Sequence, residues 1–158
     1  MGRIDVLVNI AGVNRPIDAF EVTEEDWDFI VDINLKGLFF LTQRVGRAMR
    51  DVGGGKIINM ASIMGVVGYY ERAAYCSSKA AVVNLTRVLA LEWAPFKINV
   101  NAIGPTFVVT PLTQAYFDDP RKSEELVSRI PWGRAGQPED VVGAAVFLAS
   151  DAAELVTG

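Results

Sequence analysis

The chain has 158 residues, of which 51% are hydrophobic, and a formal net charge of −4. This length suits one domain with a buried core, and the hydrophobic content excludes a disordered chain. Basic residues gather in nothing longer than a pair such as Arg121-Lys122, which argues against a nucleic-acid surface. No apolar run approaches the roughly 20 residues that span a bilayer, and no signal-peptide pattern is present. We therefore expect a soluble, cytoplasmic protein.

Two absences narrow the possible chemistry. The chain contains no histidine, which excludes a Ser-His-Asp triad, a Cys-His pair and His-ligated zinc. Its single cysteine, Cys76, excludes an internal disulfide and a thiolate metal cluster. No metal site is expected, and any acid-base chemistry would fall to Tyr, Lys, Asp or Glu.

The first half of the chain predicts a strand and a long helix. Residues 4–10 form an apolar, β-branched run closed by Ala11-Gly12. Asn9 in this run is either a turn former or a site residue. A capping box at Thr23 and Asp26 opens a helix over 23–49. Its apolar stripe is formed by Trp27, Ile30, Val31, Leu38, Leu41 and Val45.

Asn34 lies on that stripe, where an apolar residue is expected. It is either a core amide bonded to the backbone, or it orders a polar group such as a water or a catalytic side chain. The next motif, Gly53-Gly54-Gly55-Lys56, is not a phosphate loop, because Ile57 and a strand over 57–60 follow it. That strand ends just before Ser62, at the sheet edge where α/β proteins bind ligands.

A helix over 73–93 carries Tyr75 and Lys79 four residues apart, about 40° from each other on one face. With the Ser62 hydroxyl they form a plausible proton-transfer group. Alternatively, Tyr75 and Lys79 are an ordinary surface pair and Ser62 is a turn residue.

The remainder predicts a strand over 98–103, an irregular binding loop or lid over 106–131, and a last helix from Pro138 to about Ser150. Two short helices are expected in the lid, near 112–117 and 123–129. The alternation of strands and helices predicts an α/β fold with a parallel sheet. With three strands, both edges of that sheet would be open.

Four motifs in order resemble the short-chain dehydrogenases/reductases. NIAG (9–12) is similar to the family's NNAG segment, and YCSSK (75–79) to its YxxxK motif. INVNAIGPTFVVTP (98–111) resembles the nicotinamide-side segment, and residues 131–151 resemble the C-terminal helix region. Asn34, Ser62, Tyr75 and Lys79 match the family's catalytic tetrad. The resemblance implies a partial Rossmann-like, doubly wound parallel sheet, forming one domain over 1–158.

The resemblance also implies that parts of the family's domain are absent. The glycine-rich TGxxxGxG turn that carries the cofactor pyrophosphate would lie upstream of Met1, and the final strand after Gly158. We therefore expect a domain truncated at both ends, and a chain that aggregates or needs partner strands when isolated. A non-catalytic interaction module without cofactor affinity is the alternative.

By resemblance, the protein transfers hydride between NAD or NADP and a secondary alcohol or ketone. Tyr75 would be the general acid/base, Ser62 would bond the substrate oxygen, and Asn34 would hold a water that relays protons from Lys79. Lowering the pKa of Tyr75 from about 10 to 7 needs about 4 kcal/mol, which an ammonium about 4 Å away supplies at an effective dielectric near 20. The implied cofactor-binding residues are Asn9, Ala11, Gly12, Tyr75, Lys79, Pro105, Thr106, Val108 and Thr110.

The resemblance also bears on the substrate and on the assembly. Residues 90–94 and 111–120 faintly resemble members that act on sugar acids such as gluconate, the gluconate 5-dehydrogenase-like members, with 3-oxoacyl thioester reductases as the alternative. Met64, Tyr69, Phe107 and Trp132 are candidate pocket walls. Family members pair through the helices that correspond to 23–49 and 73–93, so a homodimer or homotetramer is expected.

Overall fold

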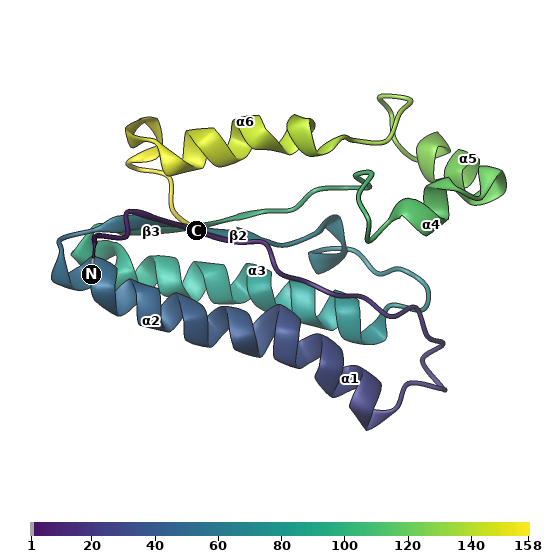
Figure 1. Ribbon diagram of the computed structural model, residues 1–158, viewed down its shortest axis with the longest axis horizontal. Helices are drawn as coiled ribbons and strands as arrows, with labels where there is room; N and C mark the ends of the chain where they lie inside the picture. Colours follow the sequence, from purple (N-terminus) through teal and green to yellow (C-terminus); the bar gives the residue numbers. More distant parts are fainter. Residues whose placement is uncertain (1) are drawn as a thin grey trace.

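Residues 2–158, which the computed structural model describes, form a parallel sheet between two layers of helices (Figure 1). In this part of the chain the strands are β1 (Val6–Asn9), β2 (Gly55–Met60) and β3 (Ile98–Ile103), in the spatial order β1-β2-β3. Both strand pairs are parallel, which places all the carboxyl ends at one edge. The predicted α/β class and the three strands are confirmed.

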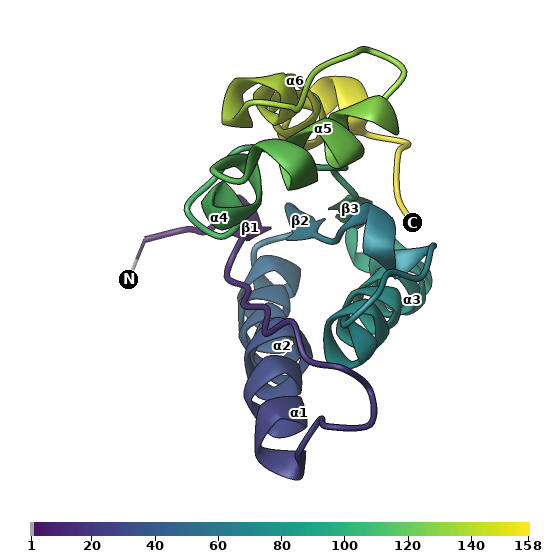
Figure 2. The ribbon, with the colours of Figure 1, turned by 90° about the vertical axis from the view of Figure 1, so that its right-hand side faces the viewer.

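Helices α2 and α3 cover one face of the sheet, and α6 lies over the other (Figure 2). The first face begins with α1 (Glu24–Val31), continues through a π-helix (Asp32–Gly37) and runs on as α2 (Leu38–Asp51). Thr23 and Asp26 form the predicted capping box. The prediction of one regular helix over 23–49 needs correction, because a wider π turn interrupts it. Such turns are frequent at functional sites.

The apolar stripe of this helix is narrower than the sequence pattern indicates. Ile30, Leu38 and Val45 are buried, but Trp27 is 39% and Leu41 50% exposed. Buried positions recur at a four-residue spacing through the π turn, so Asn34 continues the stripe with no exposed surface at all. The amide therefore lies inside the core.

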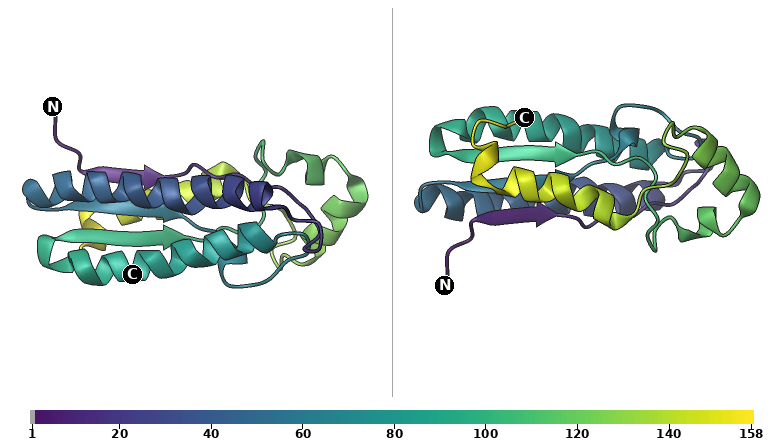
Figure 3. Two further views of the ribbon diagram at one scale, coloured as in Figure 1. Left: turned by 90° about the horizontal axis from the view of Figure 1, so that it is seen from below. Right: turned by 90° about the horizontal axis from the view of Figure 1, so that it is seen from above.

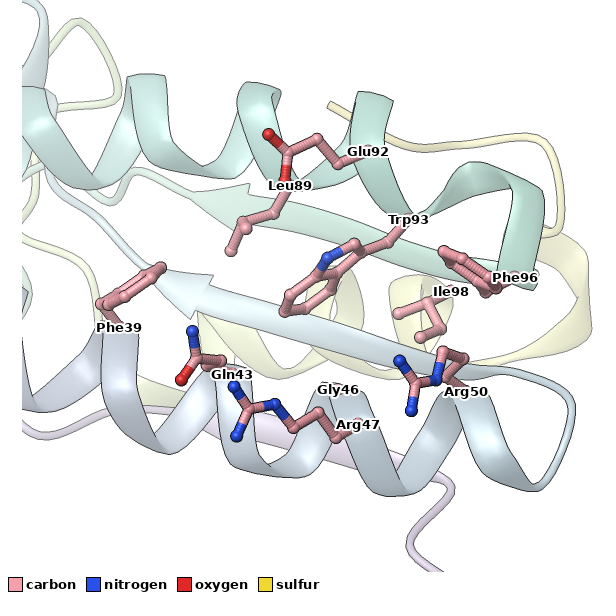
Figure 4. A pocket seen from close by; sticks show the side chains of 10 residues that line it. All are labelled: Phe39, Gln43, Gly46, Arg47, Arg50, Leu89, Glu92, Trp93, Phe96 and Ile98. Atoms are coloured by element: carbon pink, nitrogen blue, oxygen red, sulfur yellow. The ribbon is translucent and has the colours of Figure 1, made fainter.

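The main core lies between the sheet and the helices α2 and α3 (Ala73–Trp93). It contains Val45, Met49, Ile57, Leu89, Ala90, Ile98 and Val100. Trp93 points from α3 toward α2 at Gly46 (Figure 4). A Cβ added at Gly46 would lie 2.7 Å from the indole ring, so a glycine lets the two helices approach.

Strand β3 leads into a lid at the carboxyl ends of the strands (Figure 3). The lid contains α4 (Gln114–Phe117) and α5 (Pro120–Ser128), which Asp119 caps, and α6 (Pro138–Ala149) follows it. Short 3-10 turns are Ile63–Gly65, Ala94–Phe96 and Asp151–Ala153. Among residues 2–158, no helix combines the length and the apolar character required to cross a membrane.

The two edges of the sheet differ. In the described part of the chain no strand pairs with the outer side of β1, and Val8 there is 38% exposed. At the other edge the chain returns to β3, where the Gly158 backbone amide donates to the Val100 carbonyl at 2.9 Å and the Asn101 side-chain Nδ2 donates to the Val156 carbonyl. Among the described residues no further strand pairs with either edge, as predicted, but the terminal segment covers part of the β3 edge.

Candidate active site

A cavity of about 370 Å³ lies where the carboxyl ends of the strands meet the lid. Its walls come from β1 and β2, from the segment after β3 and from α6. Ser62 and Tyr75 contribute hydroxyl groups to a lining that is otherwise largely apolar. The lining residues are Val8, Ile10, Met60, Ala61, Ser62, Tyr75, Pro105, Thr106, Val108, Thr110, Thr113, Pro138, Val141, Val142 and Ala145.

A second, smaller cavity of about 70 Å³ extends beneath α4. Ser62, Tyr75, Thr106 and Thr113 line both cavities. These hydroxyl-bearing residues therefore stand at the junction of the two spaces. Two ligands, one in each cavity, could contact the same residues.

Ser62 is positioned by the short 3-10 turn that follows β2. It is the N-cap of this turn, and its Oγ accepts a hydrogen bond from the Met64 amide at 3.2 Å. The turn packs directly on α3, because a Cβ at Gly65 would lie only 2.9 Å from the Lys79 carbonyl oxygen. This close backbone approach brings Ser62 beside Tyr75.

Tyr75 lies in the first turn of α3 and is partly buried. Burial raises the pKa of its phenol above the ordinary value, while a hydrogen bond with Ser62 and the charge of Arg72 act in the opposite direction. The expectation that Lys79 lowers the pKa of Tyr75 toward 7 is therefore wrong for this structure. The loss of phenolate hydration outweighs the neighbouring charges.

Lys79 lies below the cavity floor and is only 3% exposed. Its Nζ donates to the Met60 carbonyl at 2.8 Å and stands 5.8 Å from the centroid of the Tyr75 ring. Burial lowers the pKa of this ammonium to about 8. The predicted Tyr75–Lys79 pair is thus brought to one place, with the ammonium beneath the phenol.

Asn34 is bonded to the backbone of the segment that follows β1. Its Oδ1 accepts from the Val13 amide at 2.8 Å, and its Nδ2 donates to the Val13 carbonyl and to Ser78 Oγ. A Cβ at Gly12 would lie 3.4 Å from both Asn34 Oδ1 and Lys79 Nζ. The interpretation of Asn34 as a core amide bonded to backbone is confirmed, and its water relay stays a prediction.

Asn34→Ala is expected to lower the free energy of unfolding by about 1–3 kcal/mol, because it leaves the Val13 amide and carbonyl without their partners. Denaturant titration of the cofactor-free protein measures this. Asn99→Ala is the control, because the side chain of Asn99 makes exposed bonds to the terminal segment. Equal losses in the two variants would contradict the core role of Asn34.

Asn9 faces the helices and does not line either cavity. Its Nδ2 donates to Thr42 Oγ1 and to Asn59 Oδ1, both at 2.8 Å, and Asn59 in turn donates to Thr86. This buried polar chain ties β1 and β2 to α2 and α3. The Nδ2 of Asn9 is thereby committed to the fold.

The predicted cofactor residues divide into two groups. Those that line the large cavity are Tyr75, Pro105, Thr106, Val108 and Thr110. Ala11, Gly12 and Lys79 lie outside its lining, in the adjoining segment after β1 and beneath the floor.

The predicted pocket walls are correct in part. Met64 and Phe107 line the smaller cavity, and Tyr69 packs edge-on against Phe107 with ring centroids 5.9 Å apart. Trp132 is 81% exposed, so the prediction that it forms a wall is wrong. A bridge between Val108 and Gly136 joins the two ends of the lid and leaves Trp132 on the outward excursion between them.

Four polar residues of the smaller cavity were not predicted as site residues: Asn14, Arg72, Thr113 and Tyr116. Arg72 precedes Tyr75 by one helical turn, and that spacing was the available signal, because residues three apart share a helix face. Asn14 and Tyr116 carry no comparable signal, since they reach the cavity from an irregular segment and from a four-residue helix.

The family model described as Enoyl-(Acyl carrier protein) reductase matches residues 1–158. An NAD-dependent glycerol dehydrogenase of Listeria innocua is 49% identical over 99% of this chain and 61% of its own length. A 2-dehydro-3-deoxy-D-gluconate 5-dehydrogenase of Dickeya dadantii is 47% identical over 99% of this chain and 62% of its own.

A solved structure extends the likeness to three dimensions. A putative NAD(P) dependent gluconate 5-dehydrogenase of Beutenbergia cavernae, with bound NADP at low occupancy, superposes with a TM-score of 0.97 at 46% identity. The match covers 99% of this chain and 63% of that one. The chain thus spans about three fifths of the length of these relatives. It belongs to the short-chain dehydrogenase/reductase family.

Proposed function

We propose that this chain carries the active site of an NAD(P)-dependent dehydrogenase that interconverts a secondary alcohol and a ketone on a sugar acid. The observation that carries the proposal is the position of Ser62 and Tyr75 at the junction of two cavities. One cavity suits a nicotinamide ring and the other the alcohol or ketone. Hydride transfer needs such an arrangement, because both reactants must meet at one polar point.

The residues present fit a nicotinamide cofactor. The large cavity has apolar walls for a flat ring, with Thr110 as a polar group at its edge. Beneath it, Lys79 makes one bond to the protein, which leaves two N–H groups for ribose hydroxyls near Gly12. Bound there, the nicotinamide would supply the site that accepts or returns the hydride.

The chain's own residues would handle the proton. The Tyr75 phenol gives its proton to the ketone oxygen in reduction and becomes the phenolate, and in oxidation the phenolate takes the proton from the alcohol. Ser62 donates a hydrogen bond to the same oxygen and stabilises the charge that develops there. The raised pKa of Tyr75 keeps the phenol protonated near neutral pH, which suits reduction, whereas oxidation improves as the pH rises.

Support for a sugar-acid substrate comes from the relatives. Two of the three named above are gluconate-type dehydrogenases, and the third is a glycerol dehydrogenase. A 3-oxoacyl thioester is the second candidate, favoured by the family model's description as an acyl carrier protein reductase. In favour of the sugar acid, Arg72 and Asn14 add a cationic and an amide group to the smaller cavity, and a carboxylate and hydroxyls can bond both.

The test is turnover by the complete gene product, followed through the absorbance of the reduced cofactor. The panel pairs gluconate with glucitol and adds a 3-oxoacyl thioester, each with NAD and NADP. We expect turnover of the hydroxy acid. Turnover of the thioester alone would replace the first candidate with the second, and no turnover at all would overturn the proposal.

We further propose that the protein assembles as a homodimer or homotetramer through α2 and α3. Apolar side chains stand exposed on these helices, with Phe40 57% and Leu91 79% exposed, and a groove of about 230 Å³ runs between them (Figure 4). A second copy would cover this surface.

Leu91→Glu is expected to shift the assembly toward monomers, because it places a charge in the proposed contact. Sedimentation of the complete gene product measures the change, with Leu155→Glu, 96% exposed and distant from these helices in sequence, as the control. A monomeric wild-type protein would contradict the proposed assembly.

A further inference from the structure

Arg72 is a buried cation without a carboxylate partner. It is 5% exposed, and among residues 2–158 it takes part in no ion pair. Its guanidinium donates to the Glu71 carbonyl at 3.0 Å and to the Tyr116 hydroxyl. Burying a charge is costly unless an opposite charge or several hydrogen bonds compensate it. Its carbon Cζ also lies 5.4 Å from the centroid of the Tyr116 ring. All of these partners are neutral, so the positive charge has no anion beside it.

The guanidinium stands next to the reacting centre. Arg72 lines the smaller cavity together with Ser62 and Tyr75. Its charge acts on the Tyr75 phenol and favours the phenolate. With two N–H groups used by the protein, three of the five donors of an arginine remain. An anionic ligand in this cavity could therefore reach both the guanidinium and the reacting hydroxyls.

A second polar atom in the same cavity is unsatisfied. Asn14 Oδ1 is buried and has no hydrogen-bond partner among the described residues. Asn14 also lines the smaller cavity. A buried acceptor without a donor destabilises the protein, and a hydrogen bond from a ligand hydroxyl would relieve that cost. The cavity thus presents one cationic donor and one neutral acceptor.

We propose that Arg72 binds the carboxylate of the substrate and that Asn14 accepts a hydrogen bond from one of its hydroxyls. The smaller cavity then selects polyhydroxy acids over neutral polyols with the same carbon skeleton. A guanidinium suits this role, because its planar fork can bond both oxygens of a carboxylate. The inference rests on the proposed dehydrogenase function and names the feature of the substrate that this site recognises.

A purely structural role for Arg72 makes a different prediction. Arg72 could serve only to hold α4 in place through the Tyr116 hydroxyl. In that case its loss would affect acids and neutral polyols alike, and Tyr116→Phe would have the same consequence. The charge of the ligand therefore separates the two roles.

The test compares threonate with threitol, which share four carbons and differ by a carboxylate in place of one terminal hydroxymethyl group. Calorimetry of the complete gene product with saturating reduced cofactor measures binding without turnover. We expect Arg72→Met to lower the affinity for threonate by about 10- to 100-fold and to leave the affinity for threitol within about 3-fold of the wild-type value. Arg72→Lys, which keeps the charge, should restore part of the loss.

Two further variants complete the design. Asn14→Leu should lower the affinities for threonate and threitol by similar factors, because both ligands carry hydroxyls. Tyr116→Phe should change the two affinities in parallel. Turnover of gluconate and glucitol by wild type and Arg72→Met gives the second measurement, with the loss confined to the KM for gluconate.

The outcomes separate the inference from the function on which it rests. Cofactor-dependent turnover with equal losses for acid and polyol in Arg72→Met would leave the dehydrogenase function standing and overturn the role of Arg72. A wild-type protein that binds threonate no better than threitol would also overturn the role of Arg72 and leave the dehydrogenase function standing. Absence of any turnover or ligand binding by the wild type would overturn both.

Discussion

Tyr75→Phe is expected to lower kcat/KM of the complete gene product by at least about 10³-fold. The substitution removes the hydroxyl that carries the proton, and a positioned acid or base contributes about 10²- to 10⁴-fold. Phenylalanine keeps the ring that packs between the two cavities, so the affinity for cofactor should stay within a few-fold. Initial rates in both directions, with cofactor binding measured by fluorescence, test this expectation.

Tyr70→Phe is the matched control, because Tyr70 lies in the same stretch but is 83% exposed. It should keep full activity. A Tyr75→Phe variant that retains more than about a tenth of the wild-type rate would remove Tyr75 from the role of acid/base.

The pH dependence adds an independent check on Tyr75. Because burial raises the pKa of the phenol, little phenolate exists at neutral pH in the chain by itself. Oxidation of an alcohol should therefore speed up as the pH rises, and reduction should be nearly constant below the pKa. The residual oxidation rate of Tyr75→Phe should not rise with pH.

Much of the fold could be predicted, because its signals are local. The capping box at Thr23, the helix over 73–93 and the strand over 98–103 depend on neighbouring residues, and the structure contains each of them. The π turn at Asp32–Gly37 carries no such signal. Asn34 within this turn bonds to the backbone of Val13, which is 21 positions away, so its surroundings depend on a long-range contact.

The site could be predicted where a motif fixes both spacing and chemistry. Ser62 and Tyr75 meet at the cavity junction because the turn after β2 packs on α3 at Gly65. Trp132 was misplaced, because an aromatic residue in a loop has no periodic neighbours that tell its inward side from its outward side. Asn14 was missed because its burial depends on the tertiary structure alone.

The charge state of the site could not be predicted from spacing. A Coulomb estimate for an ammonium about 4 Å from the phenol suggests a strong stabilisation of the phenolate. The structure buries both groups instead, and burial raises the pKa of Tyr75 and lowers that of Lys79. Desolvation, which no sequence pattern reports, decides the direction for both.

Lys79→Met is expected to stabilise the cofactor-free protein near pH 7 and to reduce its activity by more than about 10²-fold. Burial holds the pKa of Lys79 at about 8 against an ordinary 10.5, a difference that corresponds to about 3 kcal/mol. The unfolded chain binds this proton more tightly, so the charged lysine destabilises the fold below pH 8. Methionine fills the same space without a charge. Loss of the bond to the Met60 carbonyl offsets part of the gain and leaves about 1–2 kcal/mol.

The sign of the pH dependence of stability distinguishes the removal of a buried charge from a general packing effect. Between pH 8 and 10.5 the unfolded state binds more protons than the folded state, so the stability of the wild type should rise with pH in this window. Lys79→Met should lack that rise between pH 8 and 10.5, whereas Lys122→Met, at an exposed site, should keep it. Urea titrations at four pH values measure the slopes. A Lys79→Met variant that is less stable than the wild type, with the wild-type dependence of unfolding free energy on pH, would contradict this expectation. It would show that the fold depends on the ammonium and that burying its charge does not destabilise the protein.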